Sequence, residues 1–186
     1  MKVVYCFAVI MLVTGTLAGA GVVDNPAEKS TAAPDGAFPK LTASNLENQT
    51  FSLPQDFAGE CNLLLIAFQR EQQHNVDTWL HQMKRFENVP GFQYYELPTL
   101  DKLNPLLRWF IDNGMRRGIS DRNARARTIT LYLDKRSFRK ALNLPDEKHI
   151  YAILVDRSGR VLWRAQGDFD ETKAASLQEG LTGGRR

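Results

Sequence analysis

Residues Asn62 to Phe68 (NLLLIAF) form an apolar run without polar alternation. A strand with one face in water would alternate polar and apolar residues, so this run predicts a strand that is covered on both faces, as in a parallel sheet with helices on each side. Gln72 to Phe86 then changes to a helical period. The apolar residues of this predicted helix share one stripe: Val76, Trp79, Leu80, Met83 and Phe86. The apolar run and the helical stripe together predict the central strand of a layered α/β domain and the helix that follows it.

Alternating strands and helices are predicted along the rest of the chain. Leu46 to Leu53 indicates a short hairpin or an edge strand, Phe92 to Leu97 a second strand and Thr128 to Leu133 another, followed by a short helix through Leu142. Leu103 to Met115 predicts a helix. Its inward face is expected to carry Leu106, Leu107, Phe110 and Ile111.

The C-terminal third predicts a hairpin and a helix. Ile150 to Val155 and Arg160 to Ala165 are β-prone, and the Asp-Arg-Ser-Gly sequence between them suits a tight antiparallel turn. Asp168 or Asp170 is a candidate cap for a helix that reaches about Leu181. Alternation of this kind predicts an α/β layered fold, and the two tryptophans Trp79 and Trp163 are expected in its core.

Four segments follow from composition. Residues 1–20 carry Lys2, the apolar run Val3 to Val13 and a final Ala-Gly-Ala, which predicts a cleaved signal peptide, with a retained anchor as the alternative. Residues 21–40 predict an extended Pro/Ala linker, residues 41–182 one domain and residues 183–186 a disordered tail. The expected location is therefore periplasmic or secreted.

The quoted segments NLLLIAF and HIYAILVDRSGRVLWRAQG, each followed by a helix, resemble the two halves of a thioredoxin-like domain of the redoxin type. The resemblance covers roughly residues 41–182. It implies a central mixed β-sheet flanked by helices, closed by a C-terminal β-hairpin plus helix. A likeness of this kind is informative about fold and much less so about function.

Three further segments, VDTWL, RTITLYLDKRSFRKALNL and LVDRSGRVLWRAQGDFDE, are similar to the mitochondrial ATP synthase (Fo) assembly factors and their bacterial relatives. This resemblance implies a non-catalytic binding or assembly role of the chaperone type. Members of that family act in an organelle, whereas this chain carries a secretory-type signal.

The redox chemistry of the fold needs a cysteine at a helix N-terminus, where backbone N–H groups stabilise a thiolate. Phe68 to Val76 contains none, and of the two cysteines Cys6 lies in the predicted signal peptide while Cys61 precedes the central strand, about 23 Å from its far end. Ile150 stands where family members place a proline. The residues expected around this vestigial redox-site cleft are Arg70, Gln72, Gln73, His74, His149 and Ile150. A divergent redoxin, thiol oxidoreductase or peroxidase-like enzyme that uses Cys61 or an unrecognised site remains the alternative.

Positive charge is concentrated in one segment. Arg108 to Lys140 holds ten Lys or Arg and three Asp, in a chain of net charge +3. Five arginines fall in a predicted long loop and are the candidate partner-binding residues: Arg116, Arg117, Arg122, Arg125 and Arg127. They suit an anionic membrane surface or a membrane or envelope protein, or they only aid solubility. The modest total charge and the signal argue against nucleic acid.

Metals and cofactors find little support in the sequence. Glu71 and His74 have i, i+3 spacing, and His74, Asp77, His81 and Arg85 fall along one polar face of the first predicted helix. Two turns separate the two histidines, about 10 Å of rise, which disfavours a single ion that both would bind. The nucleotide-binding, hydrolase-elbow and zinc-protease motifs are missing as well. No metal and no cofactor is expected.

Overall fold

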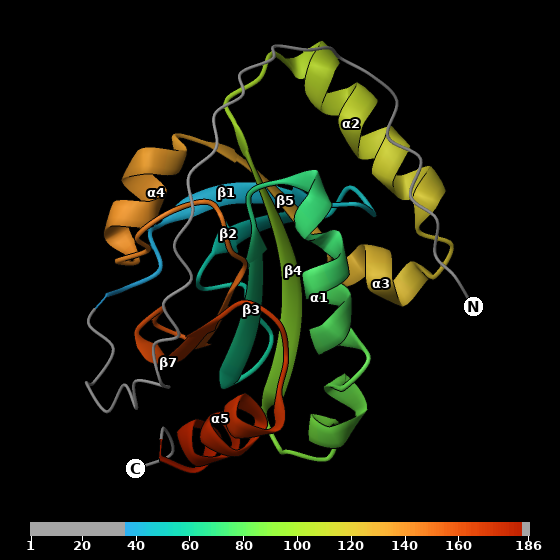
Figure 1. Ribbon diagram of the computed structural model, residues 1–186. Coiled ribbons are helices and arrows are strands. Elements are labelled where there is room, and N and C mark those ends of the chain that lie inside the picture. The colour runs from blue at the N-terminus through green and yellow to red at the C-terminus, as the bar shows by residue number, and fades with distance from the viewer. Residues whose placement is uncertain (1–35, 184–186) are drawn as a thin grey trace, which may run out of the picture.

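The computed structural model describes residues 36–183, which form a seven-stranded mixed sheet of order β2-β1-β5-β4-β3-β6-β7 (Figure 1). The strands are β1 (Leu41–Asn45), β2 (Thr50–Leu53), β3 (Cys61–Ala67), β4 (Phe92–Asp101), β5 (Ile129–Leu133), β6 (Tyr151–Asp156) and β7 (Val161–Gln166). The helices are η1 (Arg70–Gln72), α1 (Gln73–Leu80), η2 (Met83–Phe86), α2 (Pro105–Gly118), α3 (Arg122–Arg127), α4 (Lys135–Ala141) and α5 (Glu171–Gly183). The predicted α/β fold with a mixed sheet is confirmed.

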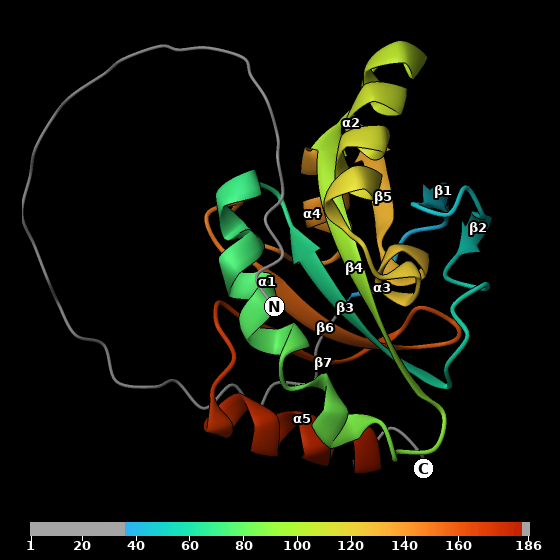
Figure 2. The same ribbon diagram turned by 90° about the vertical axis from the view of Figure 1, so that its right-hand side faces the viewer.

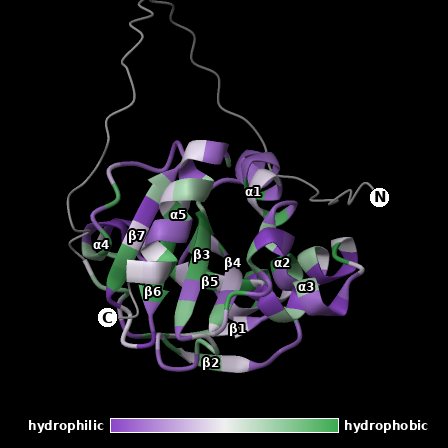
Figure 3. Cartoon of the chain, turned by 90° about the horizontal axis from the view of Figure 1, so that it is seen from below, coloured by the Kyte–Doolittle hydropathy of each residue, from purple (hydrophilic) through white to green (hydrophobic). Residues whose placement is uncertain are grey.

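Strand β3 is central, as its unbroken apolar run predicts. It pairs in parallel with β4 and antiparallel with β6. Alternate side chains point to opposite faces, so Leu63 packs in the core below α1 and α5 while Leu64 packs in the core on the α4 face. Figure 3 shows hydrophobic residues concentrated in β3 and β6, which both lie inside the sheet with a neighbouring strand on each side.

Helix α1 packs as its stripe predicts. Val76 and Trp79 are buried, and the stripe continues through Met83 and Phe86 of η2. The Trp79 ring meets Trp163 of β7 edge-on with centroids 6.1 Å apart. Both tryptophans are buried, which confirms that this helix faces the sheet.

The segment predicted as a hairpin or edge strand holds the turn of a hairpin and its second strand. Strands β1 and β2 pair antiparallel, and β2 forms one edge of the sheet. The Asn45 carboxamide oxygen accepts from the N–H groups of Glu47 and Gln49, and Asn48 adopts a left-handed φ of 63°. These bonds close the turn, because an Asn side chain can replace the backbone acceptor there.

Helix α2 forms where predicted, but of the residues expected on its inward face only Ile111 packs against the core, whereas Leu106, Leu107 and Phe110 are exposed. Asn104 caps it, its side chain accepting from Leu107 N at 3.0 Å, yet of its fourteen residues only Met115 is buried. Leu106, Trp109 and Phe110 are 74%, 62% and 62% exposed. Figure 2 shows why: α2 stands beside the upper end of β4 rather than over a face of the sheet, so no layer covers its outer side.

The prediction of a long loop for the basic segment is wrong, because most of this segment is helical. Arg116 and Arg117 end α2, and Arg122–Arg127 form α3. Asp121 caps α3 by accepting from Asn123 N at 3.0 Å. The Ser-Asp-Arg-Asn sequence is typical of a helix start as much as of a loop.

The predicted signal peptide and most of the predicted linker and tail lie outside the described residues. Residues 36–40 of the linker segment are described, and Phe38 lies in the core, its ring edge-on to Phe57 at 5.5 Å and to Phe138 at 5.7 Å. Between residues 36 and 183, no helix has the length and apolar character that crossing a membrane requires.

Candidate functional site

The turn from β3 into α1 is closed from inside by a buried glutamine. The Gln72 side-chain oxygen accepts from Phe68 N at 2.8 Å and from Gln69 N at 3.1 Å, and its amide donates to Glu147 O at 2.7 Å. All three partners are backbone groups that would otherwise need other partners on burial. Gln72 therefore fixes the turn and ties it to the segment before β6.

A cleft of about 340 Å³ lies beside this turn, between α1, the carboxyl ends of the parallel strands and α2. Its apolar wall includes Leu65, Val76, Leu97, Ile111, Met115 and Ile119, and its polar side chains include Arg70, Gln73, His74, Asp77 and Glu96. A concave apolar site with a few convergent polar groups is the usual form of a small-ligand site. The volume lies at the lower end of the usual range, about 300–1,000 Å³.

Glu96 of β4 is the buried charge of this cleft, with 7% of its surface exposed. Gln73 Nε2 donates to Asp77 Oδ1 at 3.1 Å and approaches Glu96 Oε2 at 3.5 Å, so one amide bridges two carboxylates. Burial raises the pKa of Glu96 to about 7, the Gln73 contact opposes the rise, and the Asp77 charge adds to it. The carboxyl group changes charge near neutral pH, as functional carboxylates often do.

The residues expected at the vestigial redox site divide between the cleft and other places. Arg70, Gln73 and His74 line the cleft, and Gln72 is buried in the turn beside it. His149 does not line it, because its ring faces Asp146 at 3.3 Å. Ile150 is buried in the core that α1 and α5 cover.

Sequence reasoning missed Glu96. The signal was present, because Glu96 is the one charged residue in the interior of β4 (FQYYELPTLD), whose only other charged residue is its last, Asp101. A charged residue in the middle of a covered strand is unusual unless it is paired or functional.

The Cys61 thiol lies far from this cleft. Cys61 begins β3, opposite Phe92 of β4 and Asp156 of β6, whereas the cleft adjoins the other end of β3. The residue is buried within the core that α1 and α5 cover. Catalytic thiols of reactive cysteines lie in electropositive, partly exposed surroundings, and this position has a different setting.

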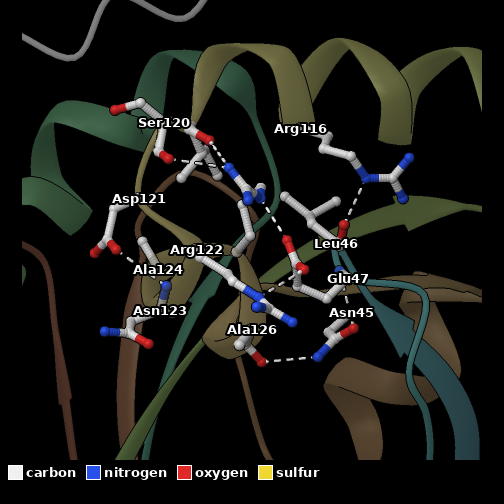
Figure 4. A network of polar contacts seen from close by, with 12 residues as sticks. Asn45, Leu46, Glu47, Arg116, Ser120, Asp121, Arg122, Asn123, Ala124 and Ala126 are labelled. Atoms are coloured by element: carbon white, nitrogen blue, oxygen red, sulfur yellow. Dashed lines mark hydrogen bonds and ion pairs between the residues drawn. The ribbon is translucent and has the colours of Figure 1, made fainter.

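Two of the five candidate arginines fasten the basic helices to the β1–β2 turn (Figure 4). Arg116 donates to Leu46 O and to Asn48 Oδ1, both at 2.6 Å. Arg125 donates to the Glu47 carboxylate at 2.5 Å and to Ile119 O at 2.9 Å. The Arg125 hydrogen bond is the main reason that the pKa of Glu47 lies below its usual range.

The other three arginines differ in the contacts that their side chains make. Arg127 donates to the Tyr94 hydroxyl at 2.7 Å and lies over that ring. Arg122 reaches Glu47 at 3.3 Å, but its side chain is 83% exposed. Arg117 is exposed at the end of α2. Of the five arginines, the structure brings Arg122 and Arg125 together at Glu47. The partner-binding role of the five stays a prediction.

The described residues hold no group of three or more His, Cys, Asp or Glu side chains placed to bind a metal ion. The His74 ring, part of the polar face considered above, instead makes a hydrogen bond with the Glu71 carbonyl oxygen.

Comparison with known proteins identifies the class of fold. No family model and no curated protein matches the chain. Among solved structures, a candidate electron transport protein from Aquifex aeolicus superposes with a TM-score of 0.58 at 10% identity, over 81% of this chain and 97% of that chain. BsSco, a member of the Sco family of cytochrome c oxidase assembly proteins, gives 0.54 at 13% identity, over 83% and 99% of the two chains. A thiol-disulfide oxidoreductase from Bacteroides fragilis gives 0.51 at 14% identity, over 77% and 98%.

These similarities and the sheet order define a thioredoxin-like fold. The predicted membership of this fold class is confirmed. At such identities the likeness speaks for the fold alone, and the resemblance to the Fo assembly factors stays a prediction.

Proposed function

We propose that this protein is a thioredoxin-like binding module of the cell envelope, which acts in the assembly of a partner protein and carries out no thiol chemistry. The observation that carries the proposal is the β3–α1 turn. Gln72 occupies it and uses both the oxygen and the nitrogen of its carboxamide to hold backbone groups. A thiol of this fold would react there, at the helix N-terminus.

The binding surface that we propose is the outer face of α2. Leu106, Leu107, Trp109 and Phe110 are large, apolar and exposed. Leu106 and Phe110 are four residues apart, so they lie one above the other on the same face of the helix. Contiguous exposed apolar groups mark interaction sites in soluble domains, and aromatic anchors carry much of the energy of protein interfaces.

A membrane or envelope protein suits this face better than an anionic lipid surface. Lipid headgroups would be attracted by unopposed positive charge, but Arg116, Arg125 and Arg127 already bind groups of the chain. Glu47 forms ion pairs with Arg122 and Arg125 and offsets part of the positive charge. The predicted signal peptide supports an envelope location, and the membership of BsSco in a family of assembly proteins is consistent with the role.

The experiment is site-specific photocrosslinking in cells of the source organism. A photoreactive amino acid at position 109 of α2 is compared with one at position 179, an exposed position of α5. We expect one dominant adduct at position 109 that the double variant Leu106→Ser, Phe110→Ser abolishes, and whose protein component binds again when purified. Adducts that are equal at both positions, or binding to vesicles of phosphatidylcholine and phosphatidylglycerol in place of a protein, would contradict the proposal.

The competing function is that of a divergent redoxin, which the oxidoreductase among the similar structures keeps in view. Insulin reduction and peroxide consumption by the purified protein, each compared with Cys61→Ser, separate the two. We expect no turnover above the rate without protein. Turnover that disappears in Cys61→Ser would establish the enzyme.

A further inference from the structure

Glu96 lies in the cleft without a cationic partner. Among residues 36–183 it forms no ion pair, and its one hydrogen bond is the 3.5 Å approach of Gln73 Nε2. A buried carboxylate that lacks a cationic partner lowers stability much more than a neutral side chain of similar shape would. The fold therefore keeps a charge in this cleft that its own packing does not need.

We propose that the cleft binds an ammonium group carried on an apolar stem, with the Glu96 carboxylate as its counter-ion. The proposal rests on the binding role proposed above and names the chemistry of one ligand. The stem would contact the wall formed by Val76, Ile111 and Met115, which α1 and α2 contribute.

The charges around Glu96 favour a cation. Asp77 of α1 is the second carboxylate, and Gln73 donates toward both. An ammonium group has three donors and could bind both carboxylates, whereas an anion would meet two like charges. His74 and Arg70, the basic residues that line the cleft, are exposed, and the residues from α2 that line it are uncharged.

The cleft, with a volume of about 340 Å³, has room for one side chain or a small amine. A lysine side chain of a partner and a free alkylamine both carry an ammonium group on an apolar stem and are small enough to enter it. Leu107 lies one turn from Ile111 on α2, so the apolar wall of the cleft leads to the exposed face of that helix.

The first experiment compares two probes of the same length on the full-length protein. Calorimetric titration with n-pentylamine and with 1-pentanol at about pH 8 measures what the charge contributes, and we expect the amine to bind at least about tenfold more tightly. Glu96→Gln should remove this preference. Glu71→Gln, which deletes an exposed carboxylate of η1 outside the cleft lining, is the matched control and should retain it.

A second titration series varies the pH. The pKa of Glu96 is about 7, so at about pH 5 the carboxyl is mostly protonated and the preference for the amine should shrink in the wild type. The Glu96→Gln variant should show no such change.

A third series distinguishes the two sources of the ammonium group. Acetyl-Leu-Lys-Leu-amide is compared with n-pentylamine and with the same peptide in which norleucine replaces lysine. Tighter binding of the lysine peptide than of the amine points to a protein side chain, and tighter binding of the amine points to a small molecule.

Equal affinity for amine and alcohol, no binding of either probe, or a preference that survives Glu96→Gln would each overturn the ammonium site. None of these results would touch the thiol assays or the crosslinking at position 109. Failure of this proposal is therefore separable from failure of the proposed function.

Discussion

Replacing Glu96 by glutamine should make the protein more stable above neutral pH. The carboxyl group has an ordinary pKa of 4.5 and a pKa of about 7 in the folded protein. Because the folded state holds this proton more tightly, the stability it contributes is complete below about pH 4.5 and is lost as the pH rises through about 7. The difference of about 2.5 in pKa corresponds to about 3–4 kcal/mol over the whole pH range, at about 1.4 kcal/mol per unit.

Urea denaturation of the wild type and of Glu96→Gln at about pH 5 and about pH 8 measures this quantity. The difference in unfolding free energy between the two proteins should change by about 2–3 kcal/mol between the two conditions, in favour of the variant at the higher pH, because pH 5 already lies above the ordinary pKa of 4.5. Any effect of the amide on packing is present at both pH values and cancels. Glu179→Gln, an exposed position on α5, should keep the wild-type profile.

A constant difference between the two proteins across this pH range would refute the reasoning. It would mean that Glu96 stays ionised in the fold, held by water or by a rearranged partner. The pH dependence predicted for amine binding would then fail with it.

The remaining predictions concern the core, the thiol and the arginines. Trp79→Ala should lower the unfolding free energy by about 3–5 kcal/mol in urea titration, because the side chain is fully buried and its indole donates to Gly167 O; a near-neutral effect would contradict the packing. Cys61→Ser should cost about 1 kcal/mol by burying a hydroxyl group and leave the crosslink at position 109 unchanged, which a capture assay checks. Arg125→Ala should lower the thermal midpoint clearly more than Arg117→Ala, because Arg125 is bound to Glu47 and Ile119 O while Arg117 is exposed; equal midpoints would reduce Arg125 to a surface charge.

Most of the fold could be predicted from the sequence, because the strongest patterns in the sequence are local. The apolar run of β3 indicates a strand that is buried on both faces. The spacing of Val76, Trp79 and Met83 indicates a helix that is buried on one face. The hairpin of β6 and β7 follows from two β-prone runs and a turn. In each of these elements the periodicity and the packing agree.

Helix α2 shows where that agreement ends. Its apolar residues at positions 106, 107 and 110 predict a helix, but periodicity does not say whether another layer lies over the apolar stripe. Only the three-dimensional position of α2, beside the end of β4, decides this. The same limit applies to the arginines, whose partners Leu46 and Glu47 lie about 70 residues away in sequence.

For a related reason, only part of the candidate site could be predicted from the sequence. The absence of cysteine at the β3–α1 turn could be read directly, and so could Arg70, Gln73 and His74 as its neighbours. Glu96 joins them through the parallel pairing of β4 with β3, a contact between distant residues. Its raised pKa depends on burial, which the residue type alone does not reveal.

The buried glutamine of the β3–α1 turn has an evolutionary consequence. A Gln72→Cys change would place sulfur in the turn and would at the same time release Phe68 N, Gln69 N and Glu147 O from their partner. Three hydrogen bonds of about 1 kcal/mol each would be lost before any thiol activity was gained. From this sequence, a path to thiol chemistry at that position therefore passes through a less stable intermediate.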